Sequence, residues 1–163
     1  MSYSRTNPSG YDTDAEKASK TVRGIATVVG AVFLLVGILG FIPGITTNIY
    51  PIDFAGHDAH AKLLGLFEVS ILHNVVHLLF GVVGLSMAKS TKGATSYLVG
   101  GGVIYLVLAV YGAVIDLATG ANFVPVNTAD NWLHLVLGLG MVALGLIGLR
   151  ATKDNRVGAG APR

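Results

Sequence analysis

Two histidines and an asparagine interrupt an apolar run of the sequence, HNVVHLLFG, over residues 73–81. His73 and His77 are four positions apart, so on a helix both side chains lie on one face. Two imidazoles at this spacing can bind one metal ion. Together with His134 and one acid they could form a site of three histidines and a carboxylate, which suits zinc or copper. The acids that could complete this site are Glu68, Asp116 and Asp130.

The same histidines allow two other interpretations. His77 and His134 could be the two axial ligands of a haem held between helices. Alternatively, each histidine forms a hydrogen bond between helices, a contact worth about 0.6–2 kcal/mol in a membrane. We favour hydrogen bonding, because H-x-x-x-H is a weak pattern and no H-E-x-x-H motif accompanies it. The main expectation is therefore that there is no cofactor, with a divalent metal or a haem as alternatives.

The composition narrows the class of protein. Of the 163 residues, 52% are hydrophobic and 12% are charged, whereas an average soluble protein has about 25% charged residues. The net charge of +2 gives no reason to expect a nucleic-acid partner. The chain has no cysteine, which excludes disulfides and cysteine nucleophiles. No Ser-His-Asp or Gly-x-Ser-x-Gly arrangement stands out, so we expect a protein that is not an enzyme.

Four long apolar segments follow one another along the chain. A helix needs about 20 residues to cross the hydrocarbon core of a membrane, and all four segments are about that long. They lack the alternation that is typical of membrane barrel strands. The sequence therefore predicts an all-α fold, a bundle of four transmembrane helices in the lipid bilayer. The predicted helices cover about 21–45, 63–88, 94–117 and 131–149.

The basic residues predict the orientation of this bundle. All Lys and Arg residues except Lys62 lie before or at the very start of the first segment, between the second and third, or after the fourth. Because basic residues collect on the cytoplasmic side, we expect both termini in the cytoplasm and a multi-pass protein of the inner (plasma) membrane. Residues 21–150 form the membrane domain in this interpretation. The polar segments 1–20 and 151–163 are expected to be mobile cytoplasmic tails.

A short internal repeat relates the second and fourth segments. Residues 74–81 and residues 131–138 both read N-x-x-H-L-x-x-G. The first and third segments share a looser pattern, VVGAVFLLVGIL from Val28 beside LVGGGVIYLVLA from Leu98. These matches predict two tandem helical hairpins, related by an axis along the membrane normal.

Helical spacing predicts which faces meet. Histidines and small residues form one stripe on the second helix, from His73 to Ala88, and another on the fourth, from His134 to Gly148. Small residues let membrane helices approach, and polar residues face the bundle interior. We therefore expect the second and fourth helices to meet along these stripes, with the histidines in the outer half. The glycines at 100–102 are expected to pack against the first helix, and Asn127 with Asp130 to form a helix start.

The stretches LHNVVHLLFGVVGL and VNTADNWLHLVLGLGM resemble a family of small four-helix membrane proteins from actinobacteria and cyanobacteria. That family is known only as a domain of unknown function, and the resemblance covers about residues 21–150. It implies an integral membrane protein and assigns no activity or cofactor. We expect an accessory or scaffold subunit that contacts other membrane proteins. A metal- or haem-binding protein and a small-molecule carrier or sensor are the alternatives.

Overall fold

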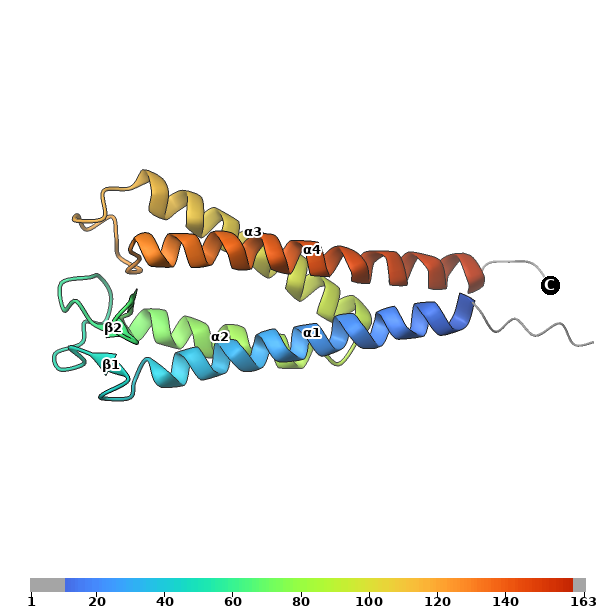
Figure 1. The fold of residues 1–163 in the computed structure, drawn as a ribbon, viewed down its shortest axis with the longest axis horizontal. Helices are drawn as coiled ribbons and strands as arrows, with labels where there is room; N and C mark the ends of the chain where they lie inside the picture. Colours follow the sequence, from blue (N-terminus) through green and yellow to red (C-terminus); the bar gives the residue numbers. More distant parts are fainter. Residues whose placement is uncertain (1–10, 160–163) are drawn as a thin grey trace, which may run out of the picture.

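The computed structural model describes residues 11–159, with side chains for residues 16–150. Four helices make up most of it and run along one long axis (Figure 1). Three of them, α1, α3 and α4, are long and apolar enough to cross a membrane, and α2 is a shorter apolar helix of 17 residues. The helices are α1 (Tyr11–Leu39), α2 (Ile71–Met87), α3 (Thr91–Val114) and α4 (Thr128–Ala159).

The helices form two tandem hairpins, as predicted. Helix α1 packs chiefly against α2, and α3 packs chiefly against α4. The start of α1 and the end of α4 lie at the same end of the molecule, opposite the two long loops (Figure 1). Helix α1 begins within the segment predicted to be a mobile tail, and α4 runs into the other predicted tail. The rest of those two predictions concerns residues 1–10 and 160–163, which lie outside the described residues.

The predicted start of the second helix is wrong, because residues 63–70 are not helical. They contribute to a small antiparallel sheet and its turn. The strands of this sheet are β1 (Thr46–Thr47), β2 (Lys62–Leu63) and β3 (Phe67–Glu68). Gly65 has a φ of 70° and lies in the tight turn that pairs Leu63 with Phe67. A left-handed conformation of this kind interrupts a helix, and glycine adopts it readily. Helix α2 starts after Ser70, whose side chain accepts a hydrogen bond from the amide of His73 at 3.1 Å.

Glycines bring the two helices of each hairpin into close contact. A Cβ atom placed on Gly30 of α1 would lie 3.0 Å from the Leu85 amide nitrogen of α2. A Cβ atom on Gly102 of α3 would lie 2.9 Å from the Val142 amide nitrogen of α4. Such spacing leaves no room for a larger residue, which is how small residues promote helix association in membranes.

These contacts correct two predictions about packing. The small-residue stripes of α2 and α4 do not meet each other, since Gly81 faces Leu34 of α1 and Gly138 faces Leu106 of α3. The glycines of α3 also do not pack on α1: Gly102 faces α4, and a Cβ on Gly100 would have no neighbour within 4 Å. The physical reason is that Gly81 and Gly138 fill the seam inside each hairpin, where the backbones come closest. Gly84 instead faces Tyr97 of α3.

The two hairpins repeat in detail. Matching positions in α2 and α4 differ by a constant 57 residues, and those in α1 and α3 by a constant 72. In the first hairpin Gly30 contacts Gly81 and Leu85, and in the second Gly102 contacts Gly138 and Val142. Likewise, Leu34 contacts Gly81 in the first hairpin and Leu106 contacts Gly138 in the second. The alignment of the first and third segments that the sequence predicted, Val28 beside Leu98, is therefore displaced by two positions, because triplet glycines match equally well in several registers.

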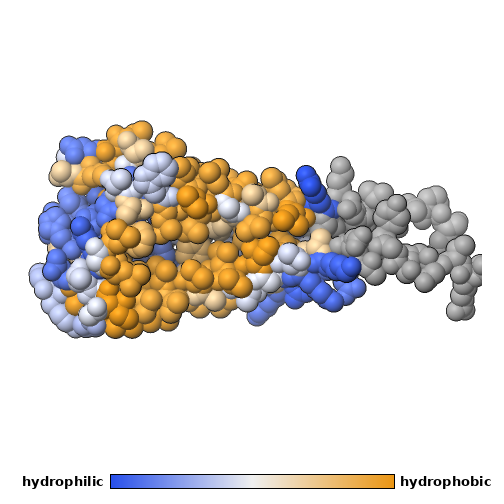
Figure 2. Space-filling model, in the orientation of Figure 1, coloured by the Kyte–Doolittle hydropathy of each residue, from blue (hydrophilic) through white to orange (hydrophobic). Residues whose placement is uncertain are grey.

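The surface is divided along the long axis. An apolar belt covers the helices between two more hydrophilic ends (Figure 2). Val28, Val107 and Val136 lie in this belt and are 63%, 61% and 64% exposed. Side chains of this kind are stable on such a surface when lipid covers it.

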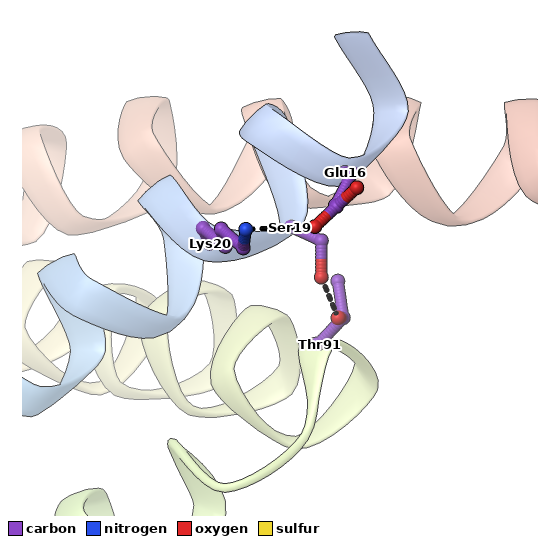
Figure 3. A network of polar contacts seen from close by, with 4 residues as sticks. All are labelled: Glu16, Ser19, Lys20 and Thr91. Carbon is purple, nitrogen blue, oxygen red and sulfur yellow. Dashed lines mark hydrogen bonds and ion pairs between the residues drawn. The ribbon is translucent and has the colours of Figure 1, made fainter. Parts of the chain in front are cut away.

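Polar contacts tie α1 to the connection between α2 and α3, at the end of the molecule opposite the two long loops. The hydroxyl groups of Ser19 and Thr91 form a hydrogen bond between α1 and α3 (Figure 3). Arg23 donates from Nε to the carbonyl oxygen of Ala88 at 3.1 Å. Lys20 and Glu16 form an exposed ion pair on α1 at 2.7 Å, which contributes little to stability. The two hairpins are therefore joined by side-chain contacts at this end.

Candidate functional site

A cavity of about 50 Å³ lies between the two hairpins, in the half of the bundle near the long loops. This volume accommodates a few small heavy atoms. Helices α2 and α3 provide most of the wall, and residues just before α4 cover one end. The lining residues are His73, Val76, His77, Phe80, Ile104, Tyr105, Leu108, Val124, Val126 and His134.

Asn122 holds the covering segment in place. Its side-chain oxygen accepts from the amide of Val126 at 2.9 Å, and its side-chain nitrogen donates to the carbonyl oxygen of Val126 at 3.0 Å. The same nitrogen donates to the carbonyl oxygen of Leu117 at 3.1 Å. Asn122 is 1% exposed, so these bonds are shielded from solvent and fix the position of Val126 over the cavity.

His73 and His77 lie next to each other on α2, as their spacing predicts. Their rings stack with centroids 4.4 Å apart. Nδ1 of His77 lies 3.0 Å from the carbonyl oxygen of His73. Because a carbonyl can only accept, Nδ1 carries the proton and Nε2 is left as an acceptor. The hydroxyl of Tyr105 in α3 therefore donates to Nε2 of His77, at 3.3 Å, across the boundary between the hairpins.

His134 reaches the same cavity from α4. Its ring meets the ring of Tyr105 edge-on, with centroids 5.0 Å apart and an interplanar angle of 84°. In the first hairpin the matching pair is Phe33 with His77, whose centroids are 5.6 Å apart. Each repeat therefore places an aromatic ring against its histidine. Only the second repeat has a hydroxyl on that ring.

One buried imidazole nitrogen, Nδ1 of His134, has no hydrogen-bond partner among the described residues, and the His134 side chain is 5% exposed. The ring of His73, which is also 5% exposed, lies within hydrogen-bonding reach of the backbone of Pro125 and Glu68. A buried nitrogen without a partner costs about 1–3 kcal/mol. Groups of this kind call for an explanation, and an ordered water is one. The surface of the cavity itself is almost wholly apolar.

The predicted helix start at Asn127 is confirmed. The Asn127 side-chain oxygen accepts from the amides of Ala129, at 2.8 Å, and Asp130, at 3.1 Å. A carboxylate oxygen of Asp130 in turn accepts from the Asn127 amide at 2.9 Å, which completes a capping box. The same oxygen accepts from the Glu68 amide at 3.0 Å. Asp130 therefore also fastens the first long loop to the second hairpin, a link that the sequence did not reveal.

The predicted site residues are only partly brought together. His73, His77 and His134 border one cavity, whereas Asp116 is exposed and accepts from the Ala118 amide in its own loop at 3.0 Å. Glu68 lies in β3 and meets Asp130 through its backbone. Among the side chains that the structure describes, in residues 16–150, no three of His, Asp or Glu are placed so that they could hold a metal ion.

Metal binding and haem binding stay predictions for these histidines. The structure gives metal binding no three-ligand group in the part of the chain that it describes. A haem between His77 and His134 would need far more space than about 50 Å³, so the hairpins would have to separate to admit it.

Sequence reasoning missed Tyr105, the residue that joins the hairpins beside the cavity. Its hydroxyl is the only side-chain group of α3 that bonds a histidine among the described residues. The internal repeat could have revealed it, because the correct alignment places Tyr105 opposite Phe33. A polar substitution at a repeated core position is a useful signal for a site.

The apolar belt, the glycine-packed helices and the buried polar groups at one depth define a multi-pass α-helical membrane protein. The chain belongs to the family described as a domain of unknown function, DUF4383, which matches residues 23–147. This confirms the resemblance to a family known only as a domain of unknown function. The actinobacterial and cyanobacterial range stays a prediction. No curated protein and no solved structure matches the chain.

Proposed function

We propose that the protein is a membrane-embedded carrier or sensor that binds a small molecule in the cavity between its hairpins. One observation carries this proposal: a cavity with an almost wholly apolar surface lies between the hairpins, among the rings of His77, Tyr105 and His134. Ligand pockets are lined predominantly by apolar and aromatic side chains, as this cavity is. The chemistry required is binding and release, for which no nucleophile is needed.

Co-purification tests this function. The protein is solubilised gently from its own host, and organic-soluble molecules that remain bound are extracted and identified by mass spectrometry. Ile104 lines the cavity and Val103 does not, while the two side chains are 48% and 49% exposed. We expect a molecule that accompanies the wild type and Val103→Trp but is depleted from Ile104→Trp. Equal recovery of every bound molecule from the two variants would contradict the proposal.

We also propose, as a second candidate, an accessory or scaffold role in a membrane assembly. The supporting observation is an exposed small-residue face on α3, where Ser96 and Gly100 are four positions apart. Such a face lets another membrane helix approach closely. If a partner binds there, Gly100→Leu lowers its recovery in crosslinked complexes while leaving the isolated protein folded. Unchanged recovery of every crosslinked partner would rule out this face.

The predicted orientation and cofactors remain part of the proposal. Lys and Arg side chains at the α1 start and the α2–α3 connection support cytoplasmic termini in the plasma membrane. A reporter fused after Arg163 is then active only in the cytoplasm. Elemental and optical analysis of the purified protein tests metal and haem, and His77→Leu releases either one if His77 is a ligand. Unchanged metal content in that variant excludes His77.

A further inference from the structure

We infer that a basic surface at the end of the molecule opposite the long loops binds the headgroup of an anionic membrane lipid. The surface consists of Lys20, Arg23, Lys89 and Lys92, and all four side chains are exposed. This binding is independent of the cavity and of the function proposed for it. Three features support it: the convergence of the four residues, their unbalanced charge and their depth relative to the apolar belt.

One contact brings Arg23 of α1 to the end of α2. Arg23 donates from Nε to the carbonyl oxygen of Ala88 at 3.1 Å, and Lys89 is the next residue. Among the described residues Arg23 forms no other side-chain hydrogen bond, so both Nη groups are left to donate to a phosphate.

A second contact brings Lys20 of α1 to the start of α3. The hydroxyl groups of Ser19 and Thr91 form a hydrogen bond (Figure 3). Lys20 follows Ser19 in the chain, and Lys92 follows Thr91. The two contacts therefore gather basic residues from α1 and from the α2–α3 connection at one place, although they are far apart in the sequence.

The charge of the basic surface is not balanced by nearby acids. Glu16 pairs with Lys20 at 2.7 Å, and no acid forms an ion pair with the other three residues among the side chains described for residues 16–150. The remaining acids in that range lie in the long loops or at the start of α4, at the far end of the molecule. Four basic residues and one acid leave a net charge of +3. Such a cluster attracts an anion.

The basic surface begins where the apolar belt ends, and hydrophilic residues adjoin the belt at this end (Figure 2). Val28 of α1 lies in the belt and follows Arg23 by five residues, which is about 7.5 Å along a helix. Lys89 lies just beyond Met87, the last residue of α2. The headgroup regions of a bilayer add about 5–8 Å on each side of the hydrocarbon core. The basic side chains therefore lie at the depth of lipid phosphates.

Lipid is the source of anions at this depth. One Lys or Arg close to the membrane surface favours anionic lipid over neutral lipid by about fivefold. Headgroups surround the helices here without any partner protein, so an anionic lipid reaches the basic surface wherever the membrane contains one. The geometry and the charge together select a lipid with a negatively charged headgroup.

Quenching of tryptophan by brominated lipids tests the inference. The full chain is placed in mixed vesicles of phosphatidylglycerol and phosphatidylcholine, with bromine on one lipid and then on the other. Comparing the two gives the association constant of the anionic lipid relative to the neutral lipid beside the tryptophan. Trp132 is the only tryptophan and lies at the far end of the molecule, 65% exposed. Trp132→Phe/Val82→Trp moves the reporter to the last two turns of α2, at a side chain that is 56% exposed.

We expect a relative constant of about five at the Val82→Trp reporter, the preference given by one basic side chain, and close to one at Trp132. Adding Lys89→Gln/Lys92→Gln should lower the first value toward one. Lys62→Gln is the matched control, because Lys62 lies at the far end, and it should leave the value unchanged. Salt at about 1 M should also lower the value, because the screening length falls to about 3 Å.

Three results would overturn the inference. A relative constant near one at the Val82→Trp reporter would leave the basic surface to an acidic segment of a partner protein. An equal preference for the anionic lipid at both reporters would show that the selectivity does not belong to this end. If the glutamine variant fails to fold, the salt series on the parent reporter decides, and a value that salt does not change would exclude an electrostatic site.

Discussion

The two hairpins share one frame and differ at one end. In both, glycines of the first helix contact the backbone of the second, in the same register. In both, an asparagine side chain, Asn74 or Asn131, occupies the space beside a glycine of the partner segment, Gly40 or Gly112. The differences lie near the long loops, where the cavity is. The repeated residues therefore build the bundle, and the candidate site combines the repeated pair His77 and His134 with His73 and Tyr105, which break the repeat.

The helix starts show how one substitution changes a role. Ser70 caps α2, Asn127 caps α4, and these positions correspond in the repeat. Three residues later the first hairpin has His73 and the second has Asp130. Asp130 turns back to bond the Asn127 amide, whereas the ring of His73 lines the cavity. The same repeat position therefore fastens the first long loop in one hairpin and lines the cavity in the other.

The largest expected effect comes from filling the glycine seams that the hairpins share. Gly81→Leu and Gly138→Leu should each lower the free energy of unfolding by about 3 kcal/mol, because the added side chain meets a neighbouring helix at under 3 Å. Reversible unfolding in detergent measures the loss. Gly100→Leu is the control, since its Cβ would have no neighbour within 4 Å. If Gly81→Leu were as stable as this control, the seam would not be close-packed.

The asparagine contacts provide a test of the repeat itself. Gly40→Ala should cost about 2 kcal/mol, because its methyl group would meet the side chain of Asn74. Adding Asn74→Ala should remove most of that cost, so the double-mutant cycle gives a large coupling energy. Gly112→Ala with Asn131→Ala should behave in the same way. Additive effects in one hairpin and coupling in the other would show that the two contacts are not equivalent.

Sequence patterns sufficed for the number of helices and their pairing into hairpins. Apolar length gives the number of spans, and the short connection at residues 88–90 leaves α2 and α3 adjacent in the chain. The Asn127 cap was also predictable, because its signature is local. All of these features depend on residues close together in the sequence.

Features that depend on distant contacts were not predictable. The start of α2 was missed because residues 63–68 pair as strands around Gly65, although their composition matches that of an apolar helix. The partners of the glycine stripes were wrong because a stripe shows which face is small, without showing which helix covers it. Tyr105 was missed for a similar reason, since its partner His77 lies on the other hairpin.

Removing the Asp130 carboxylate should release the first long loop from the second hairpin. Asp130→Ala leaves the amides of Glu68 and Asn127 without their acceptor, and we expect a loss of about 2 kcal/mol. Hydrogen exchange should accelerate at both amides. Asp116→Ala is the control, because Asp116 is exposed and bonds only within its own loop among the contacts described. Unchanged protection of the Glu68 amide would show that Asp130 does not hold the first loop.

The smallest expected effect sharpens the comparison most, because it comes from a substitution that makes the second repeat match the first at one position. Tyr105→Phe gives the second hairpin the ring type of Phe33 and removes the hydroxyl that donates to His77. We expect a loss of about 1 kcal/mol, typical of one hydrogen bond. The ¹⁵N chemical shift of His77 Nε2 should move at the same time, which a loss of ring packing alone would not produce. Tyr50→Phe, at a side chain that is 82% exposed, should change neither quantity. A constant His77 shift in Tyr105→Phe would mean that the hairpins are joined at this depth by ring packing alone, and that the hydroxyl at the broken repeat position has another partner.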